Sequence, residues 1–423
     1  MKITHLLVGA LALTAVSSVF ADVTIEITGS SAFRSATLTS IKNRFAAAPV
    51  PSFSYAHEGA SLTSSTRAVF RGSFPGVSGT TTIRTCFTGS VEGIDALVNT
   101  SSPLYVTQYL PVTVLTGITD TAGGTEVANA SGTLQDATAE FAFSDVSAAS
   151  SPYAASPLLP SDAAVGVVTF TMIASKDAPA SLTNVTNKQF QALFGVGFVP
   201  LSLFTGDAAD TNLVFATGRN DGSGTRTTYL AETGYGIANP VNQYMVVAST
   251  ASDITQLQRV PGGSNASYAS KVWGQNIDGN GGYSSGGTLS TDLTKGTANV
   301  EVLDADGSSL GAFPLTLVSW LGTSDAAKIP TAKVLAYNGV SITPNSGGLS
   351  AADVAKVTNG QYTAWGYEYF YRRGDLTSGD AVTIYNAIVG TAPAGSNLAL
   401  GSAGIPLSSM NVARAEDGGV VLP

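Results

Sequence analysis

The sequence of 423 residues has one cysteine and two histidines, and both scarcities limit its chemistry. A single cysteine, Cys86, excludes an intrachain disulfide and a lipid-anchoring cysteine behind a leader peptide. We expect it to be reduced and buried as a small apolar side chain. His5 lies in the leader described below, so a Ser-His-Asp triad or a multi-histidine metal site would depend on His57 alone. The sequence therefore predicts a protein that is not an enzyme and that holds no metal or cofactor.

Charged residues are also few, at 12% of the chain, and acidic residues outnumber Lys and Arg by 29 to 20. Nucleic-acid-binding domains usually carry a basic stripe, whereas basic residues cluster here only at Arg372 and Arg373. We therefore expect no nucleic-acid partner. An acidic protein can still bind a small anion, because a few N–H groups and one arginine set the potential at a site.

The N-terminus has the pattern of a secretory signal peptide. It begins Met1-Lys2, continues apolar over residues 6–20, and has Val19 and Ala21 at the third and first positions before Asp22. The apolar run is short for a membrane span, and no later segment reaches the length required. Removal of residues 1–21 predicts a periplasmic or secreted protein without a lipid anchor.

Strand-like and helix-like segments alternate along the chain, which predicts an α/β fold with mixed sheets. Strands are expected at residues 23–28, 139–143, 165–174 and 214–217, and helices at 32–41, 94–98, 186–194 and 227–232. Residues 186–189 form a capping box at the start of one helix. At this length one hydrophobic core is insufficient, so we expect two lobes.

The segment Gly218–Arg226 (Gly-Arg-Asn-Asp-Gly-Ser-Gly-Thr-Arg) is the most informative motif. Its glycines let backbone N–H groups approach a small ligand, and the helix that follows supplies unpaired donors and a partial positive charge. Arg219 adds a planar fork of donors that suits a tetrahedral oxyanion. The motif lacks the lysine of a nucleotide-hydrolase loop and the third glycine of a dinucleotide loop. It favours a small-anion cradle, although a polar turn that caps an ordinary helix has the same composition.

Other polar loops have similar character. Gly29-Ser30-Ser31 and Ser144-Asp145 each follow a predicted strand, and residues 88–93 precede a predicted helix. Ligands of open α/β sheets bind outside the carboxyl ends of strands, at helix N-termini. Two acidic loops, 278–280 and 304–307, begin like calcium loops but lack the bidentate acid at the twelfth position, so we interpret them as Asx turns.

Together these motifs resemble the periplasmic phosphate-binding proteins of ABC importers, the PstS-like family. The resemblance covers most of the chain after residue 21, and its specific part is Arg-x-Asp-Gly-Ser-Gly-Thr at 219–225. It implies a divergent type II periplasmic-binding-protein fold, with two lobes joined by two crossover segments. Lobe 1 would comprise residues 22–164 and 366–423, and lobe 2 residues 165–365. Segments 42–84 and 93–139 would add β-hairpins to the first lobe.

The resemblance also implies a phosphate site. Donors to the phosphate oxygens would be Arg219, Ser223, Gly224 and Thr225 from one lobe and Ser90 from the other, with Ser30 and Ser31 in the first loop. Asp221 would orient Arg219, and Asp145 would accept the proton of a protonated phosphate, which sulfate lacks. The first loop has Ser31-Ala32 where the family favours Thr-Phe.

The implied function is capture of inorganic phosphate, or a similar tetrahedral oxyanion, by an exported monomer that serves an ABC permease. Sulfate, arsenate and an organic phosphate remain open as ligands. A second hypothesis is a secreted structural, adhesive or matrix protein that keeps the fold without tight binding. A third, a serine hydrolase that uses Ser90 or Ser223, lacks a nearby base in the sequence.

Overall fold

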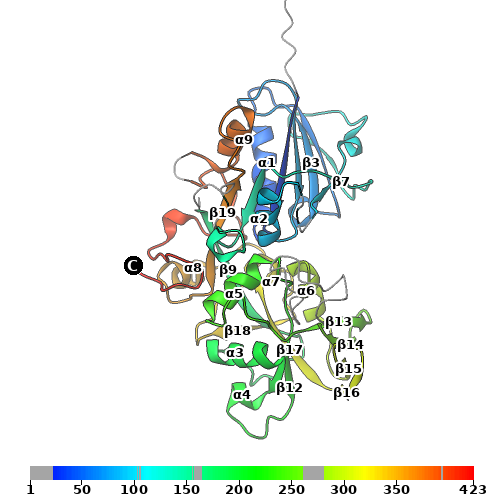
Figure 1. Cartoon of the computed structure of the whole chain (residues 1–423), viewed down its shortest axis with the longest axis vertical. Coiled ribbons are helices and arrows are strands. Elements are labelled where there is room, and N and C mark those ends of the chain that lie inside the picture. The colour runs from blue at the N-terminus through cyan, green and yellow to red at the C-terminus, as the bar shows by residue number, and fades with distance from the viewer. Residues whose placement is uncertain are drawn as a thin grey trace, which may run out of the picture.

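The computed structural model describes residues 22–101, 103, 106–154, 156, 164–260, 281–391 and 394–423. The predicted signal peptide with His5, and the acidic loop at 278–280, lie outside the described residues. The described chain forms an upper and a lower lobe along the long axis of the molecule (Figure 1). Among the described residues, no helix has both the length and the apolar character needed to cross a membrane.

The upper lobe is built mainly from the N-terminal part of the chain. Its strands are β1 (Val23–Gly29), β2 (Phe53–His57), β3 (Arg67–Gly72), β4 (Thr81–Cys86), β5 (Gln108–Tyr109), β6 (Thr125–Val127), β7 (Gln135–Asp136) and β8 (Phe141–Ser144). Its helices are α1 (Arg34–Ala46), α2 (Ser90–Val98) and α9 (Asp380–Val389), with the 3-10 turns η1 (Leu62–Ser64), η2 (Val112–Leu115) and η3 (Ala148–Ser150).

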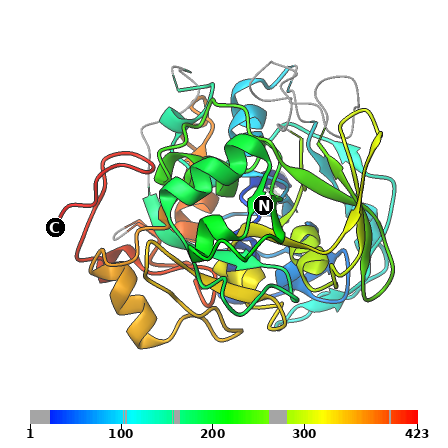
Figure 2. The same cartoon turned by 90° about the horizontal axis from the view of Figure 1, so that it is seen from below.

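The lower lobe follows in sequence. Its strands are β10 (Asn184–Val185), β11 (Phe198–Pro200), β12 (Leu213–Ala216), β13 (Tyr244–Ser249), β14 (Ile254–Arg259), β15 (Val300–Leu303), β16 (Ser309–Phe313), β17 (Leu315–Gly322) and β18 (Lys333–Tyr337). Its helices are α3 (Asn187–Val196), α4 (Ser202–Thr205), α5 (Gly224–Glu232), α6 (Gly286–Leu293), α7 (Thr323–Ala326) and α8 (Ala351–Thr358). The four-stranded sheet β13–β16 lies on the opposite side of this lobe from α8 (Figure 2).

Two long strands, β9 (Ala164–Ala174) and β19 (Trp365–Arg372), connect the lobes. The first half of β9 pairs antiparallel with β19, and its second half pairs antiparallel with β17 and β18. β19 also pairs with β8 of the upper lobe. The main sheet therefore runs through both lobes in the order β11-β12-β17-β9-β19-β8-β1-β4-β3-β2-β6. A two-lobed α/β fold with mixed sheets is confirmed, while the exact lobe boundaries stay a prediction because β9 pairs with strands of both.

The local sequence explains the elements nearest the lobe junction. β9 is buried along all but its first residue, which its nearly continuous apolar sequence anticipates. The capping box before α3 is confirmed: Gln189 N–H donates to Thr186 Oγ1 (3.2 Å), and Thr186 N–H donates to Gln189 Oε1 (2.8 Å). Each of the other predicted strands and helices overlaps an observed element of the same type.

The two predicted insertions differ in structure. Within residues 42–84, the strands β2, β3 and β4 form an antiparallel meander, so added hairpins are confirmed there. Within 93–139, β5 pairs antiparallel with β7, but β6 pairs parallel with β2. The second insertion is thus folded back onto the first through a parallel edge strand.

Cys86, at the end of β4, is a free thiol and 1% exposed, as predicted. Burial raises the pKa of this thiol to about 11. The thiolate, which is the reactive form, is therefore scarce at neutral pH.

Candidate functional site

The site is formed where the N-termini of α2, in the upper lobe, and α5, in the lower lobe, meet. Val91 N–H, in the first turn of α2, donates to the carbonyl oxygen of Gly222, which precedes α5 (3.0 Å). Gly89 and Gly222 allow this approach, since a β-carbon on Gly89 would lie 2.5 Å from the Gly222 oxygen. The two lobes are therefore in direct contact at the loops that the sequence singled out.

Asp145, directly after β8, places its carboxylate between these helix ends. It accepts hydrogen bonds from Ser90 Oγ of the upper lobe and from Thr225 Oγ1 of the lower lobe, the latter at 3.2 Å. Its backbone oxygen accepts from Thr228 Oγ1 at 3.1 Å. A β-carbon on Gly224 would overlap Asp145 Oδ1. We call Ser90, Asp145, Gly224 and Thr225 the clasp, because their contacts join the lobes.

The side chains of the clasp are buried. Asp145 is 1% exposed, and burial raises the pKa of its carboxyl, against the opposing influence of the Ser90 hydroxyl and the Arg219 guanidinium. Both carboxylate oxygens nevertheless have a hydroxyl donor. An oxyanion is thus already held at the start of α5, and it belongs to the protein itself.

Arg219 is 2% exposed and held by the lower lobe. Its Nε donates to the Tyr283 carbonyl (3.0 Å) and its Nη2 to the Ser284 carbonyl (2.9 Å), while Nη1 reaches Ser31 Oγ of the upper lobe at 3.4 Å. Burial lowers the pKa of Arg219, and the carboxylates of Asp325 and Asp145 counteract this. The predicted orientation of Arg219 by Asp221 stays a prediction.

Ser30 and Ser223 serve local structure in this conformation. Ser30 Oγ accepts the Phe33 N–H at the start of α1 (3.3 Å) and donates to Glu368 Oε2 (3.3 Å). Ser223 Oγ accepts the Arg226 N–H (3.3 Å), so it is the N-cap of α5. Both residues therefore lie at the predicted loops, but their hydroxyls are already engaged.

Two buried acidic residues near the clasp were not predicted from the sequence. Glu92, in the first turn of α2, accepts from Asn220 Nδ2 at 3.4 Å, and burial raises its pKa. Glu368, in the middle of β19, is fully buried, and burial together with the Asp145 charge raises its pKa well above the usual value. Glu92 lies within the predicted loop at 88–93, whereas nothing in the aromatic β19 sequence signals that Glu368 turns toward the junction.

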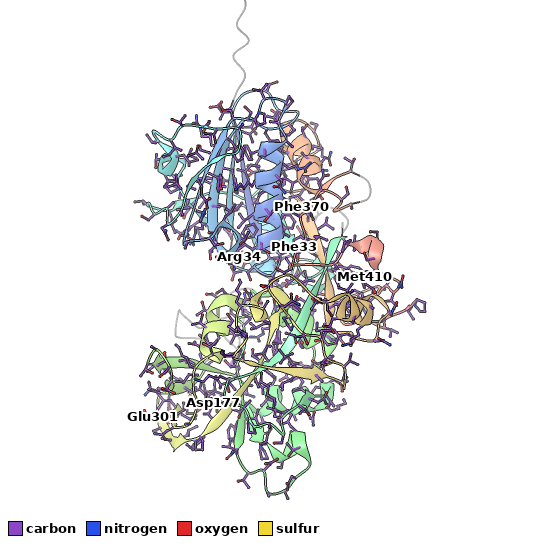
Figure 3. All side chains as sticks on the ribbon, turned by 180° about the vertical axis from the view of Figure 1, so that it is seen from behind. Phe33, Arg34, Asp177, Glu301, Phe370 and Met410 are labelled. Carbon is purple, nitrogen blue, oxygen red and sulfur yellow. The ribbon has the colours of Figure 1, made fainter. Side chains whose placement is uncertain are left out.

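A cavity of about 250 Å³ lies beside Ser31, between the start of α1 and the short helix α7. Its charged lining residues are Arg34, Asp325 and Lys328, none of which the sequence identified. Figure 3 labels Arg34 at the end of α1 that faces the other lobe. Because Ser31 both lines the cavity and contacts Arg219, the cavity adjoins the predicted site.

His57 takes part in a chain of polar contacts in the upper lobe. Its Nε2 lies 2.7 Å from Glu126 Oε1, and its Nδ1 lies 3.1 Å from Ser65 Oγ. Ser65 is 3% exposed, and its hydroxyl is directed at the backbone carbonyls of Ser61 (2.8 Å) and Glu58. A nucleophile needs an accessible hydroxyl that donates to its base, so the contacts describe a structural network.

The acidic loop at 304–307 contains the turns expected from its sequence. Asp306 Oδ1 accepts the Ser308 N–H at 2.9 Å, which is an Asx turn. Among the described residues, no group of three or more His, Cys, Asp or Glu side chains is placed to hold a metal ion.

No protein-family model and no curated protein matches the chain. Among solved structures, it is similar to a putative phosphate ABC transporter substrate-binding protein with bound phosphate from Clostridium perfringens, at 10% identity and a TM-score of 0.39 over 86% of this chain and 93% of that one. An ABC-type phosphate transport receptor from Vibrio cholerae gives 9% identity and a TM-score of 0.39 over the same shares. A phosphate-binding protein from Stenotrophomonas maltophilia gives 13% and 0.32 over 83% and 78%. These TM-scores are low, and the two-lobed α/β fold is established by the strand order of the main sheet.

Proposed function

We propose that the chain is an exported, non-enzymatic receptor that captures inorganic phosphate, or a similar tetrahedral oxyanion, between its two lobes. The observation that carries the proposal is the Asp145 carboxylate, an oxyanion that receives hydroxyl donors from both lobes beside the start of α5. Donors arranged for one oxyanion at a helix N-terminus suit another of similar size. Delivery to an ABC permease is part of the same proposal.

Binding requires the lobes to separate enough to admit a ligand. Separation frees Thr225 Oγ1 and the α2 N–H groups that now meet Gly222, while Ser90 Oγ stays beside Asp145 in the upper lobe. The phosphate then takes these donors together with Arg219, and Asp145 turns from an internal anion into the acceptor of a phosphate proton. Domain closure around a ligand is a common motion of two-lobed receptors.

The contacts of the clasp also favour a second candidate, a secreted structural or adhesive protein. Asp145 is satisfied by Ser90 and Thr225, and the Val91 N–H is satisfied by Gly222. The lobes can therefore close without a ligand. In this case the clasp is a permanent joint between the lobes, and phosphate does not displace Asp145 from its hydrogen bonds.

Calorimetry on residues 22–423 with phosphate, arsenate and sulfate separates the two candidates. The receptor proposal expects phosphate binding with micromolar or tighter affinity and a rise in the melting temperature, because a ligand that binds only the folded state stabilises it. Chloride at matched ionic strength is the control. Absence of heat and of any thermal shift with all three oxyanions contradicts the receptor and favours the permanent joint.

A further inference from the structure

The cavity beside Ser31 is lined by hydroxyl groups as well as by charge. Its hydroxyl-bearing residues, drawn from both lobes, are Ser31, Ser35, Thr63, Ser64, Ser324, Ser346 and Ser402. Each hydroxyl can both donate and accept a hydrogen bond, so the wall is suited to a ligand that carries hydroxyl groups itself. The volume of about 250 Å³ corresponds to roughly eight water molecules in the liquid, which is more than inorganic phosphate fills.

Arg34 is the unusual member of this wall. It is 6% exposed, and its Nε has no hydrogen-bond partner among the described residues. The carboxylate of Asp325 acts on its charge, but this carboxylate also accepts a hydrogen bond from Lys328 Nζ at 2.8 Å. A buried guanidinium with an unsatisfied donor is costly. An anion in the cavity that Arg34 lines offsets its charge.

The local charge balance points the same way. Arg34 and Lys328 supply two positive charges to the wall, and Asp325 supplies one negative charge. Arg219, which contacts the cavity residue Ser31, adds another guanidinium close by and repels Arg34. An anion beside Arg34 offsets this repulsion between buried cations.

We propose that this cavity binds a small hydroxylated organic anion, with its acidic group at Arg34 and Lys328 and its hydroxyl-bearing body against the serine and threonine wall. The acidic group is a phosphate monoester or a carboxylate, and the body has the size of glycerol. This site goes beyond the proposed clasp and does not depend on it, because none of its charged residues belongs to the clasp.

Calorimetry with glycerol 3-phosphate and glycerate tests the proposal on residues 22–423, with glycerol and inorganic phosphate as reference compounds. At least one of the two hydroxylated anions is expected to bind more tightly than glycerol by on the order of a hundredfold, since charge-assisted hydrogen bonds dominate such sites. The stronger of the two identifies the acidic group. Failure of both anions to bind overturns the proposal.

Variants locate the site. Arg34→Gln is expected to weaken the bound anion about tenfold or more, and Lys328→Gln about three- to tenfold. The side chain of Lys328 is 46% exposed, so Lys328→Gln is expected to fold normally. It therefore still tests the site if Arg34→Gln fails to fold. Lys356→Gln is the matched control, because Lys356 makes the same i,i+3 ion pair with Asp353 on α8 and does not line the cavity. Equal affinities in Lys328→Gln and Lys356→Gln overturn the proposal.

The outcome is distinguishable from that of the proposed function. If inorganic phosphate binds and depends on Arg219, while the organic anions do not bind, the receptor proposal stands and the cavity proposal fails. If the organic anions bind and depend on Arg34 and Lys328, while inorganic phosphate does not bind, the cavity proposal stands alone.

Discussion

The clasp and the Arg34 cavity both adjoin Arg219, and they treat their charged groups in opposite ways. In the clasp, the Asp145 carboxylate has a hydroxyl donor on each oxygen. In the cavity, Arg34 is 6% exposed, its Nε lacks a partner among the described residues, and the side chain lines a space of about 250 Å³. The comparison shows that the polar groups of a donor-rich motif can satisfy one another without a ligand. A buried charge beside a cavity, with a donor that has no partner, is not satisfied in this way.

Arg219 offers the largest expected effect, because it lies between the two regions. Arg219→Ala removes the guanidinium donors and leaves a bound anion without its nearest charge, so phosphate affinity should fall by on the order of a hundredfold or more, about 2–5 kcal/mol. Calorimetry measures the loss. Arg259→Ala, a partly exposed arginine of the same lobe paired with Asp304, is the control. Unchanged phosphate affinity in Arg219→Ala would remove this residue from the site.

Gly224→Ala breaks the clasp. The new β-carbon overlaps Asp145 Oδ1 and crowds Ser90 Oγ, so the lobes must separate or Asp145 must turn away. We expect a loss of about 1–3 kcal/mol in the free energy of unfolding, measured by urea denaturation, as for other overpacked sites. Gly287→Ala in α6 is the control, since its nearest contact would be Ser285 Oγ at 3.9 Å. An unchanged free energy of unfolding in Gly224→Ala would show that Asp145 can move away from the new β-carbon at little cost.

Glu368 tests whether a third acid strains the clasp. Because its folded pKa is raised well above the usual value, its neutral form is favoured, and its contribution to stability is fully present below about pH 4.5. That stability is lost as the pH rises through the folded pKa. Glu368→Gln should therefore flatten the decline of stability toward high pH and raise the free energy of unfolding at pH 8 by about 1–3 kcal/mol, since glutamine is neutral in both states and removes the cost of keeping a buried carboxyl protonated.

Urea denaturation of both proteins between pH 5 and pH 8 measures this difference. Glu416 is exposed, so Glu416→Gln is a control for the loss of a charge. Parallel pH profiles for Glu368→Gln and the unaltered protein would show that Glu368 ionises without cost in the folded state.

Most features that depend on interactions between residues close in sequence could be predicted from the sequence. The apolar run of β9, the capping box of α3 and the turn at Asp306 depend on neighbours along the chain, and each is confirmed. The loops at Ser90, Asp145 and Gly224 were also expected to approach one another, because they follow strands or open helices.

The sequence did not anticipate which partner each polar group takes. The occupation of the helix ends by Asp145, rather than by a ligand, depends on how closely α2 and α5 approach across the junction. Arg34 follows a serine-rich loop and has the pattern of an ordinary helix residue. The cavity that it lines forms only when α7 and the loops at Ser346 and Ser402 come together beside α1. Such long-range packing leaves no local pattern in the chain.

Asp145→Asn gives the smallest and most specific effect, because asparagine keeps the shape of the clasp. The amide oxygen can accept from one hydroxyl and the amide nitrogen can donate to the other, so the lobes should still close. If Asp145 accepts a phosphate proton, the amide also offers sulfate a donor and removes a charge that repels it. Absolute affinities can shift in either direction, but the ratio of sulfate to phosphate affinity should rise about tenfold or more near neutral pH. Calorimetry with both ions on the same preparation measures this ratio. An unchanged ratio would mean that Asp145 joins the lobes without selecting the ligand, and discrimination would then have to come from Arg219 or from the cavity beside it.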